Sequence, residues 1–117
     1  MGALAQHFVR ILAVDFEFQA VDGEVPVPSA LCAYEVLTGQ EYQYRGSELR
    51  RMREAPFDVG ERTLFVCHYA TAELGCFEAL GWPMPLRIID TWIEERVRRF
   101  GLSNHFGFSL LILSILF

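Results

Sequence analysis

The feature that most constrains the fold is an uninterrupted segment near the start of the chain, residues 8–18, that contains no turn-forming residue. Most of its side chains are β-branched, aromatic or aliphatic, a composition that is typical of a buried β-strand. An Asp-Gly pair and two prolines follow this segment and indicate a turn region. We therefore expect the fold to begin with one buried strand.

The segments that follow predict an α/β sheet with an antiparallel start. Two strand-like segments joined by a Thr-Gly turn favour a hairpin, and beyond them helical and strand-like patterns alternate. Ser47 is the expected cap of the first helix and Thr71 that of the second. The expected order is β-β-β-α-β-α-β-α, with strands at 8–18, 30–37, 41–44, 63–69 and 86–89 and helices at 48–54, 72–80 and from 90 to the glycine at 101.

Length and composition indicate a single domain, residues 1–117. A chain with 52% hydrophobic and 21% charged residues is too apolar to be intrinsically disordered. Its net charge is −5 and all ten basic residues are arginine, which counts against a protein that binds nucleic acid by electrostatics alone. It counts less against a nuclease, because carboxylates that hold divalent cations are negative until the metal binds.

Cysteine usage and the end of the chain bear on its location. Cys32, Cys67 and Cys76 form an odd set without CxxC spacing, and no signal segment opens the chain, so we expect a reducing cytoplasm. The apolar stretch at 106–117 is shorter than the roughly 20 residues of a membrane-spanning helix, so we expect no membrane anchor. We interpret this stretch as the aberrant apolar tail of a truncated or frame-shifted chain, which covers the sheet or causes association.

Two acidic residues in the first strand are the strongest candidates for a functional site. Asp15 and Glu17 are two residues apart, so on a strand they share one face, while Val14, Phe16 and Phe18 share the other. Neighbouring carboxylates repel each other, and a divalent cation with oxygen ligands neutralises them. The alternative is a strand face that merely meets water.

A third acidic residue, Glu73, is expected in the first turn of the helix at 72–80. Its helical neighbours at i+3, i+4 and i+7 are Cys76, Phe77 and Leu80, so it lies at the end of the apolar stripe and needs a partner. The alternative is a carboxylate that only interacts with the helix dipole.

These segments resemble the 3′–5′ proofreading exonuclease domains of family A DNA polymerases, particularly the phage-type ones, which belong to the DEDD exonucleases. The run ILAVDFEF matches the family's D-x-E motif with Asp15 and Glu17. The run HYATAE is similar to its H-N-x-x-x-D motif, with Glu73 in the place of the acid. The next strand often ends in Asp-Thr, as Asp90 and Thr91 do here. The resemblance implies a ribonuclease H-like fold.

The resemblance also implies a nuclease that shortens single-stranded DNA from its 3′ end. Two Mg²⁺ or Mn²⁺ ions would activate a water and stabilise the leaving oxygen. Asp15 and Glu17 are then the ligands of both ions, and Glu73 helps to position one of them. The family's third motif, Tyr or His followed four residues later by Asp, has no counterpart, because no acidic residue follows Glu95. We therefore expect a fold that is incomplete at the carboxyl end and a weak or inactive nuclease.

Two further residues have competing interpretations. Asp90 is expected to cap the helix that follows it, and a place among the metal ligands is the alternative. His68 lies on a mostly apolar strand and is expected to be a core histidine, or one that supports the ligands, rather than a general base.

Two other functions stay open at this point. One is a non-catalytic remnant domain that acts as a structural or docking module beside a DNA polymerase region or chain. The other is an RNA-trimming exonuclease of the same fold, because no residue that would read a 2′-OH can be identified. In each case the expected setting is the cytoplasm of a bacterial or phage-infected cell.

Overall fold

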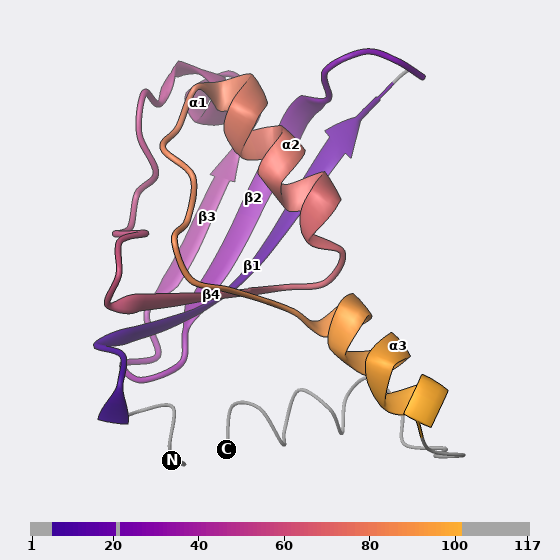
Figure 1. The fold of residues 1–117 in the computed structure, drawn as a ribbon. Helices are drawn as coiled ribbons and strands as arrows, with labels where there is room; N and C mark the ends of the chain where they lie inside the picture. The colour runs from indigo at the N-terminus through magenta and orange to yellow at the C-terminus, as the bar shows by residue number, and fades with distance from the viewer. Residues whose placement is uncertain (1–5, 21, 102–117) are drawn as a thin grey trace.

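Eight elements of secondary structure make up residues 6–20 and 22–101, the part of the chain that the computed structural model describes (Figure 1). Their order, β-β-β-α-β-α-β-α, confirms the predicted order. The predicted apolar tail at 106–117 lies outside the described residues. The strands are β1 Arg10–Gln19, β2 Val27–Glu35, β3 Glu41–Arg45, β4 Thr63–Cys67 and β5 Ile88–Asp90, and the helices are α1 Gly46–Arg51, α2 Ala70–Leu80 and α3 Thr91–Gly101.

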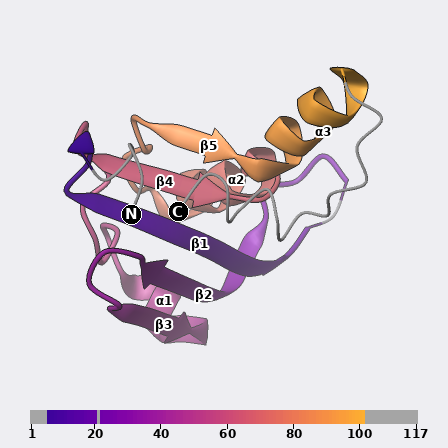
Figure 2. The same cartoon turned by 90° about the horizontal axis from the view of Figure 1, so that it is seen from below.

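The five strands form one mixed sheet in the order β3-β2-β1-β4-β5 (Figure 2). β1, β2 and β3 are antiparallel neighbours, whereas β4 runs parallel to both β1 and β5. This arrangement confirms an α/β sheet with an antiparallel start. α1 and α2 pack on the sheet, while α3 packs mainly on β5 and projects away from it (Figure 1). Within residues 6–20 and 22–101, no helix is long and apolar enough to cross a membrane.

The main core lies between the sheet and α2, and β1 supplies its centre. Leu12, Val14 and Phe16 are buried on the face of β1 that α2 covers. The ring of Phe16 packs against Phe77 of α2, with centroids 5.8 Å apart, and against Trp82 at 6.1 Å. Burying a large apolar side chain of this kind stabilises the fold by about 1.5–3 kcal/mol. The buried members of the core are Leu12, Val14, Phe16, Leu31, Ala33, Leu49, Phe57, Phe65, Cys67, Cys76, Phe77 and Trp82.

The first helix differs from its prediction in where it starts, and it contributes one side chain to the core. α1 begins at Gly46, directly after β3, and its N-cap residue Arg45 makes no side-chain capping bond. The prediction of a Ser47 cap is therefore wrong. Gly46 has a φ of +53°, a conformation that glycine adopts easily, and it lets the chain turn from strand to helix without a loop. Leu49 is fully buried, so α1 is part of the core and not only a solvated surface helix.

The length of β1 creates the feature on which the candidate site depends. β1 pairs with β4 only as far as Ala13, which lies opposite Val66, but β1 continues to Gln19. On its other edge β1 stays paired with β2 through Gln19. The carboxyl half of β1 therefore has one edge that no parallel strand covers, and its backbone N–H groups there need other acceptors.

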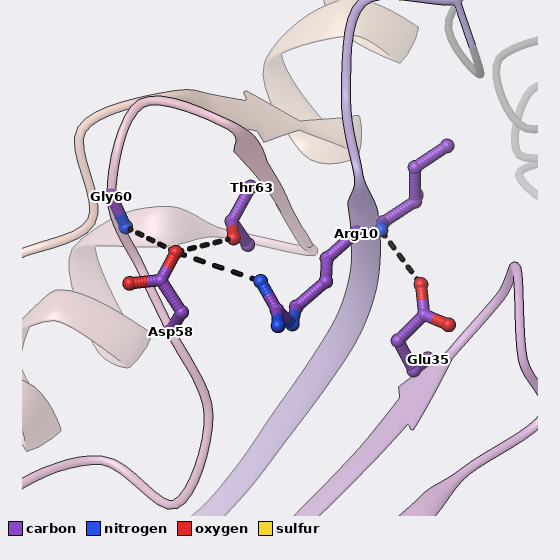
Figure 3. Close-up of polar contacts among 6 residues, drawn as sticks. Arg10, Glu35, Asp58, Gly60 and Thr63 are labelled. Carbon is purple, nitrogen blue, oxygen red and sulfur yellow. Dashed lines mark hydrogen bonds and ion pairs between the residues drawn. The ribbon is translucent and has the colours of Figure 1, made fainter.

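Two carboxylates hold the opposite end of the sheet together (Figure 3). Buried Glu35, at the end of β2, accepts hydrogen bonds from the backbone N–H groups of Ile11, Leu37 and Thr38, the first at 2.9 Å. Burial alone would raise the pKa of Glu35, but these hydrogen bonds outweigh it and hold the pKa below its ordinary value. Glu35 therefore replaces missing strand partners at the hairpin.

The second of these carboxylates, Asp58, organises the loop before β4. It accepts hydrogen bonds from the Thr63 hydroxyl at 3.1 Å and from the Gly60 N–H at 3.4 Å (Figure 3). The guanidinium of Arg10 lies 3.8 Å from the same oxygen, and both side chains are partly exposed, so this ion pair adds little stability.

We expect Glu35→Ala to lower the free energy of unfolding by about 3 kcal/mol, because it leaves backbone N–H groups without an acceptor. The lowered pKa means that the contribution of Glu35 is present above its unfolded pKa of about 4.5 and is lost as the pH falls through the folded value. Urea unfolding at neutral pH and near pH 3 measures both effects. Glu41→Ala, at an exposed glutamate of β3, is the control; an equal loss in both variants would contradict this role of Glu35.

Candidate carboxylate site

Asp15 and Glu17 lie on the stretch of β1 that continues past β4. Both are exposed and share the face opposite Val14 and Phe16, as the alternation of the strand predicted. Phe18 follows an irregularity in the pairing between Glu17 and Phe18 and is 36% exposed. The regular alternation that presents the two acids therefore ends directly after Glu17.

Glu73, in the first turn of α2, reaches the uncovered edge of β1. Its side chain is only 3% exposed, and its Oε2 accepts a hydrogen bond of 3.0 Å from the backbone N–H of Phe16. Phe16 is the residue between Asp15 and Glu17. The fold thus brings the third predicted acid to the backbone of the other two, although 56 residues of sequence separate Glu73 from Glu17.

The electrostatics of the group follow from this placement. Burial raises the pKa of Glu73 to about 8, and the negative charge of Asp15 adds to the rise. The Phe16 N–H opposes it, and Glu17 contributes a smaller increase. At neutral pH the Glu73 carboxyl is therefore mainly protonated. A carboxyl held neutral by burial and by two nearby acids is a group that a cation would ionise.

The side chains, as they stand, do not form a complete ligand sphere. Within residues 6–20 and 22–101, no three His, Cys, Asp or Glu side chains gather closely enough to hold one metal ion. One oxygen of Glu73 is already engaged by Phe16. The carboxylate oxygens have the right chemistry for Mg²⁺ or Mn²⁺, but the side chains would have to close around such an ion.

Asp90, the last residue of β5, holds the start of α2 in place. Its carboxylate accepts hydrogen bonds from the backbone N–H groups of Tyr69 at 2.9 Å and Ala70 at 2.8 Å, and also from that of Trp92 at 2.9 Å. Burial alone would raise the pKa of Asp90, but these bonds keep it below its ordinary value. The predicted cap of the following helix is confirmed through Trp92. The predicted Thr71 cap of α2 is wrong, since Tyr69 is the N-cap residue and Asp90 supplies the acceptor.

His68 is exposed, so of its two expected roles that of a core histidine is wrong, while that of a residue that supports the ligands stays a prediction. Its Nδ1 is 3.2 Å from the hydroxyl of buried Thr91, which donates its own proton to the Cys67 carbonyl at 3.1 Å. The Thr91 hydroxyl therefore links the His68 ring to the backbone carbonyl at the end of β4. His68 and Asp15 both line a hollow of about 460 Å³ on this face of the sheet.

The buried thiols take no part in this chemistry. Burial raises the pKa of Cys67 to about 12, with Asp90 and Glu73 adding to the rise, and burial likewise raises the pKa of Cys76 to about 12. Thiols with such pKa values carry almost no thiolate at neutral pH and are poor nucleophiles and metal ligands.

Two features at this site had no predicted role. Tyr69 has a left-handed backbone with a φ of 67°, and Trp92 packs edge-to-face against it at a centroid distance of 5.2 Å. Arg96 stacks over the Trp92 ring at 4.7 Å. The sequence shows that an aromatic residue directly follows both His68 and Thr91. The contact between these two rings could not be predicted from it, because the contact depends on how β4 and β5 pair.

Comparisons with protein-family models, with curated proteins and with solved structures found no match.

We expect Glu73→Gln to stabilise the metal-free protein at high pH, because the amide keeps the acceptor for Phe16 without a titrating group. With the folded pKa raised to about 8, the folded protein holds a proton that the unfolded chain loses above pH 4.5. Wild-type stability therefore falls between these values by at most about 1.4 kcal/mol per pH unit, and the variant escapes that fall. Urea unfolding across pH 4–9 measures the difference.

Glu78→Gln, at an exposed position of the same helix, is the matched control for this experiment. Its stability should follow the wild-type pH profile. Parallel profiles for wild type and Glu73→Gln would contradict a raised pKa at Glu73.

We expect Asp90→Ala to lower the free energy of unfolding by about 2 kcal/mol, since it removes the acceptor for backbone N–H groups at the starts of two helices. Asp90→Asn should lose less, because its amide oxygen can still accept. Chemical denaturation is the measurement and Glu94→Ala, in the first turn of α3, is the control. A variant Asp90→Ala as stable as the control would show that Asp90 does not hold this junction.

Proposed function

We propose that this chain is the core of a metal-dependent 3′–5′ exonuclease domain of the proofreading type, which hydrolyses phosphodiester bonds at single-stranded DNA 3′ ends. One observation carries the proposal: Glu73 bonds the backbone of Phe16, between Asp15 and Glu17. Asp15 and Glu17 of β1 and Glu73 of α2 are thus brought to the part of β1 that β4 leaves uncovered, although their side chains do not gather around one point. Ligand-binding sites are commonly found at the carboxyl ends of parallel strands. Acidic residues placed close together there repel each other and lower stability unless a ligand neutralises them.

The sheet supports a ribonuclease H-like fold as the finer description. Three antiparallel strands are followed by two parallel strands that join through helices, and the first strand is central. The candidate acids lie at the carboxyl end of that central strand.

Each residue has a distinct part in the proposed reaction. Asp15 and Glu17, both exposed on one face, would bind Mg²⁺ or Mn²⁺, and Glu73 would help to position an ion once it ionises. The bound cations would supply an activated water and stabilise the leaving 3′ oxygen. His68, which lines the same hollow as Asp15, would contact water or substrate on that face.

The proposal includes low activity for the isolated chain. This sequence has no acidic residue after Glu95, so the fourth carboxylate of the family pattern is missing from it. A second candidate function, a non-catalytic docking or structural module beside a DNA polymerase, is favoured by a specific observation. No three potential ligands gather around one point in the described parts of the chain, and Glu73 is already bonded to Phe16.

We expect calorimetry to detect Mn²⁺ binding by the wild-type chain. Asp15→Asn should bind Mn²⁺ about ten-fold more weakly or worse, because even the loss of a residue that only supports the ligands typically weakens a metal site by that factor. Degradation of a 5′-labelled single-stranded oligonucleotide, followed on a gel, should be slow, metal-dependent and absent from the variant. Glu78→Gln should behave as wild type in both assays.

Either result separates the two candidate functions. Metal binding that Asp15→Asn loses, with 3′-end shortening, supports the exonuclease. Absence of metal binding in every protein contradicts it and leaves the docking module.

A further inference from the structure

Tyr69 is exposed in a conformation that its residue type does not favour. It is the sole non-glycine residue with a positive φ in the described ranges, with φ 67° and ψ 73°, and its side chain is 46% exposed. Asparagine or glycine adopts this left-handed conformation more readily, so an aromatic ring here costs stability. Since the ring is not buried in the core, packing does not account for it.

The Tyr69 ring packs against Trp92, and Trp92 in turn packs against Arg96. Tyr69 and Trp92 meet edge-to-face, at an interplanar angle of 76°, and the Arg96 guanidinium lies over the Trp92 ring. An indole in contact with both groups restricts their motion and fixes the guanidinium near an exposed aromatic face. We call Tyr69, Trp92 and Arg96 the aromatic platform.

The aromatic platform lies next to the carboxylate site. Tyr69 is the N-cap residue of α2, and Glu73 is in the first turn of the same helix. The carboxylate of Asp90 binds the backbone of both Tyr69 and Trp92, so it ties the two rings to one point of the fold. Tyr69 of the platform and Glu73 of the site are therefore held at the same end of α2.

We propose that the aromatic platform binds single-stranded DNA, with a base stacked on Tyr69 and a phosphate contacted by Arg96, while Trp92 positions both. Stacking on an exposed aromatic ring is independent of sequence because every base has a π-face. The Arg96 guanidinium places a positive charge beside Trp92 in a chain whose net charge is −5. This inference rests on the proposed function for its choice of ligand, but it is tested by binding alone.

The experiment is fluorescence anisotropy of a labelled oligothymidine with the full chain, in EDTA, so that no metal or hydrolysis takes part. Tyr69→Asn should weaken binding about five-fold or more, and thermal unfolding should show it to be at least as stable as wild type, because Asn suits a positive φ. Arg96→Gln should also weaken binding and reduce its salt dependence. An oligomer of abasic deoxyribose phosphates should bind wild type and Tyr69→Asn equally.

Tyr34→Leu is the matched control, because Tyr34 is 45% exposed on the sheet face that carries Asp15. Equal binding by Tyr69→Asn and wild type would overturn the proposal. No detectable binding by wild type would also overturn the proposal. A loss of binding confined to Tyr34→Leu would overturn it too, because the bases would then stack on the sheet face.

The same series separates this proposal from the exonuclease proposal. Glu78→Gln, at an exposed position of α2 outside both sites, should bind the oligonucleotide in EDTA as wild type does. If Tyr69-dependent binding is found but no metal-dependent cleavage, the aromatic platform stands and the exonuclease falls. If cleavage is found while Tyr69→Asn leaves affinity unchanged, the platform falls and the exonuclease stands.

Discussion

The hydrogen bond from the Phe16 N–H to Glu73 is the interaction on which the site depends. β1 runs beyond its parallel neighbour, so a backbone donor at its exposed edge requires an acceptor. A glutamate on α2 supplies it, but at the cost of burying a carboxyl beside Asp15 and Glu17. Burial at this place, and then the charge of Asp15, raise the pKa of Glu73, although the bond to the Phe16 N–H itself opposes the rise. A bound divalent cation would neutralise these carboxylates and so lower the pKa of Glu73.

A second constraint acts at the start of α2, where the carboxylate of Asp90 stabilises the strained backbone of Tyr69. Tyr69 adopts a left-handed backbone, and Asp90 accepts its N–H together with that of Ala70. The junctions after β4 and β5 thus share one carboxylate, which fixes the first turn of α2 and with it Glu73. Stability given up at such a junction is common at functional sites, where the surrounding structure holds an unfavourable conformation in place.

The sequence predicted those features that depend on local patterns. Alternation along β1 was enough to place Asp15 and Glu17 on one face, and the order of strands and helices followed from turn residues and apolar runs. The convergence of Glu73 on these acids came from the family resemblance rather than from periodicity. Asp90 was predicted correctly as the cap of α3, but the cap of α2 was predicted wrongly, because Asp90 reaches it from the neighbouring strand and no local pattern reports a partner 20 residues away. Glu35 was missed for the same reason, since its backbone partner Ile11 becomes a neighbour only when β1 and β2 pair.

The most direct test of this account is an NMR titration of the Glu73 side-chain carboxyl carbon in the metal-free protein and in Asp15→Asn. The account predicts a pKa of about 8 in the wild-type protein and a lower value in the variant, since the charge of Asp15 contributes to the rise. A Glu73 that titrates near the ordinary value of 4.5 in both proteins would contradict it. In that case the three carboxyl groups would not form one electrostatic unit, and no shared metal site could be argued from them.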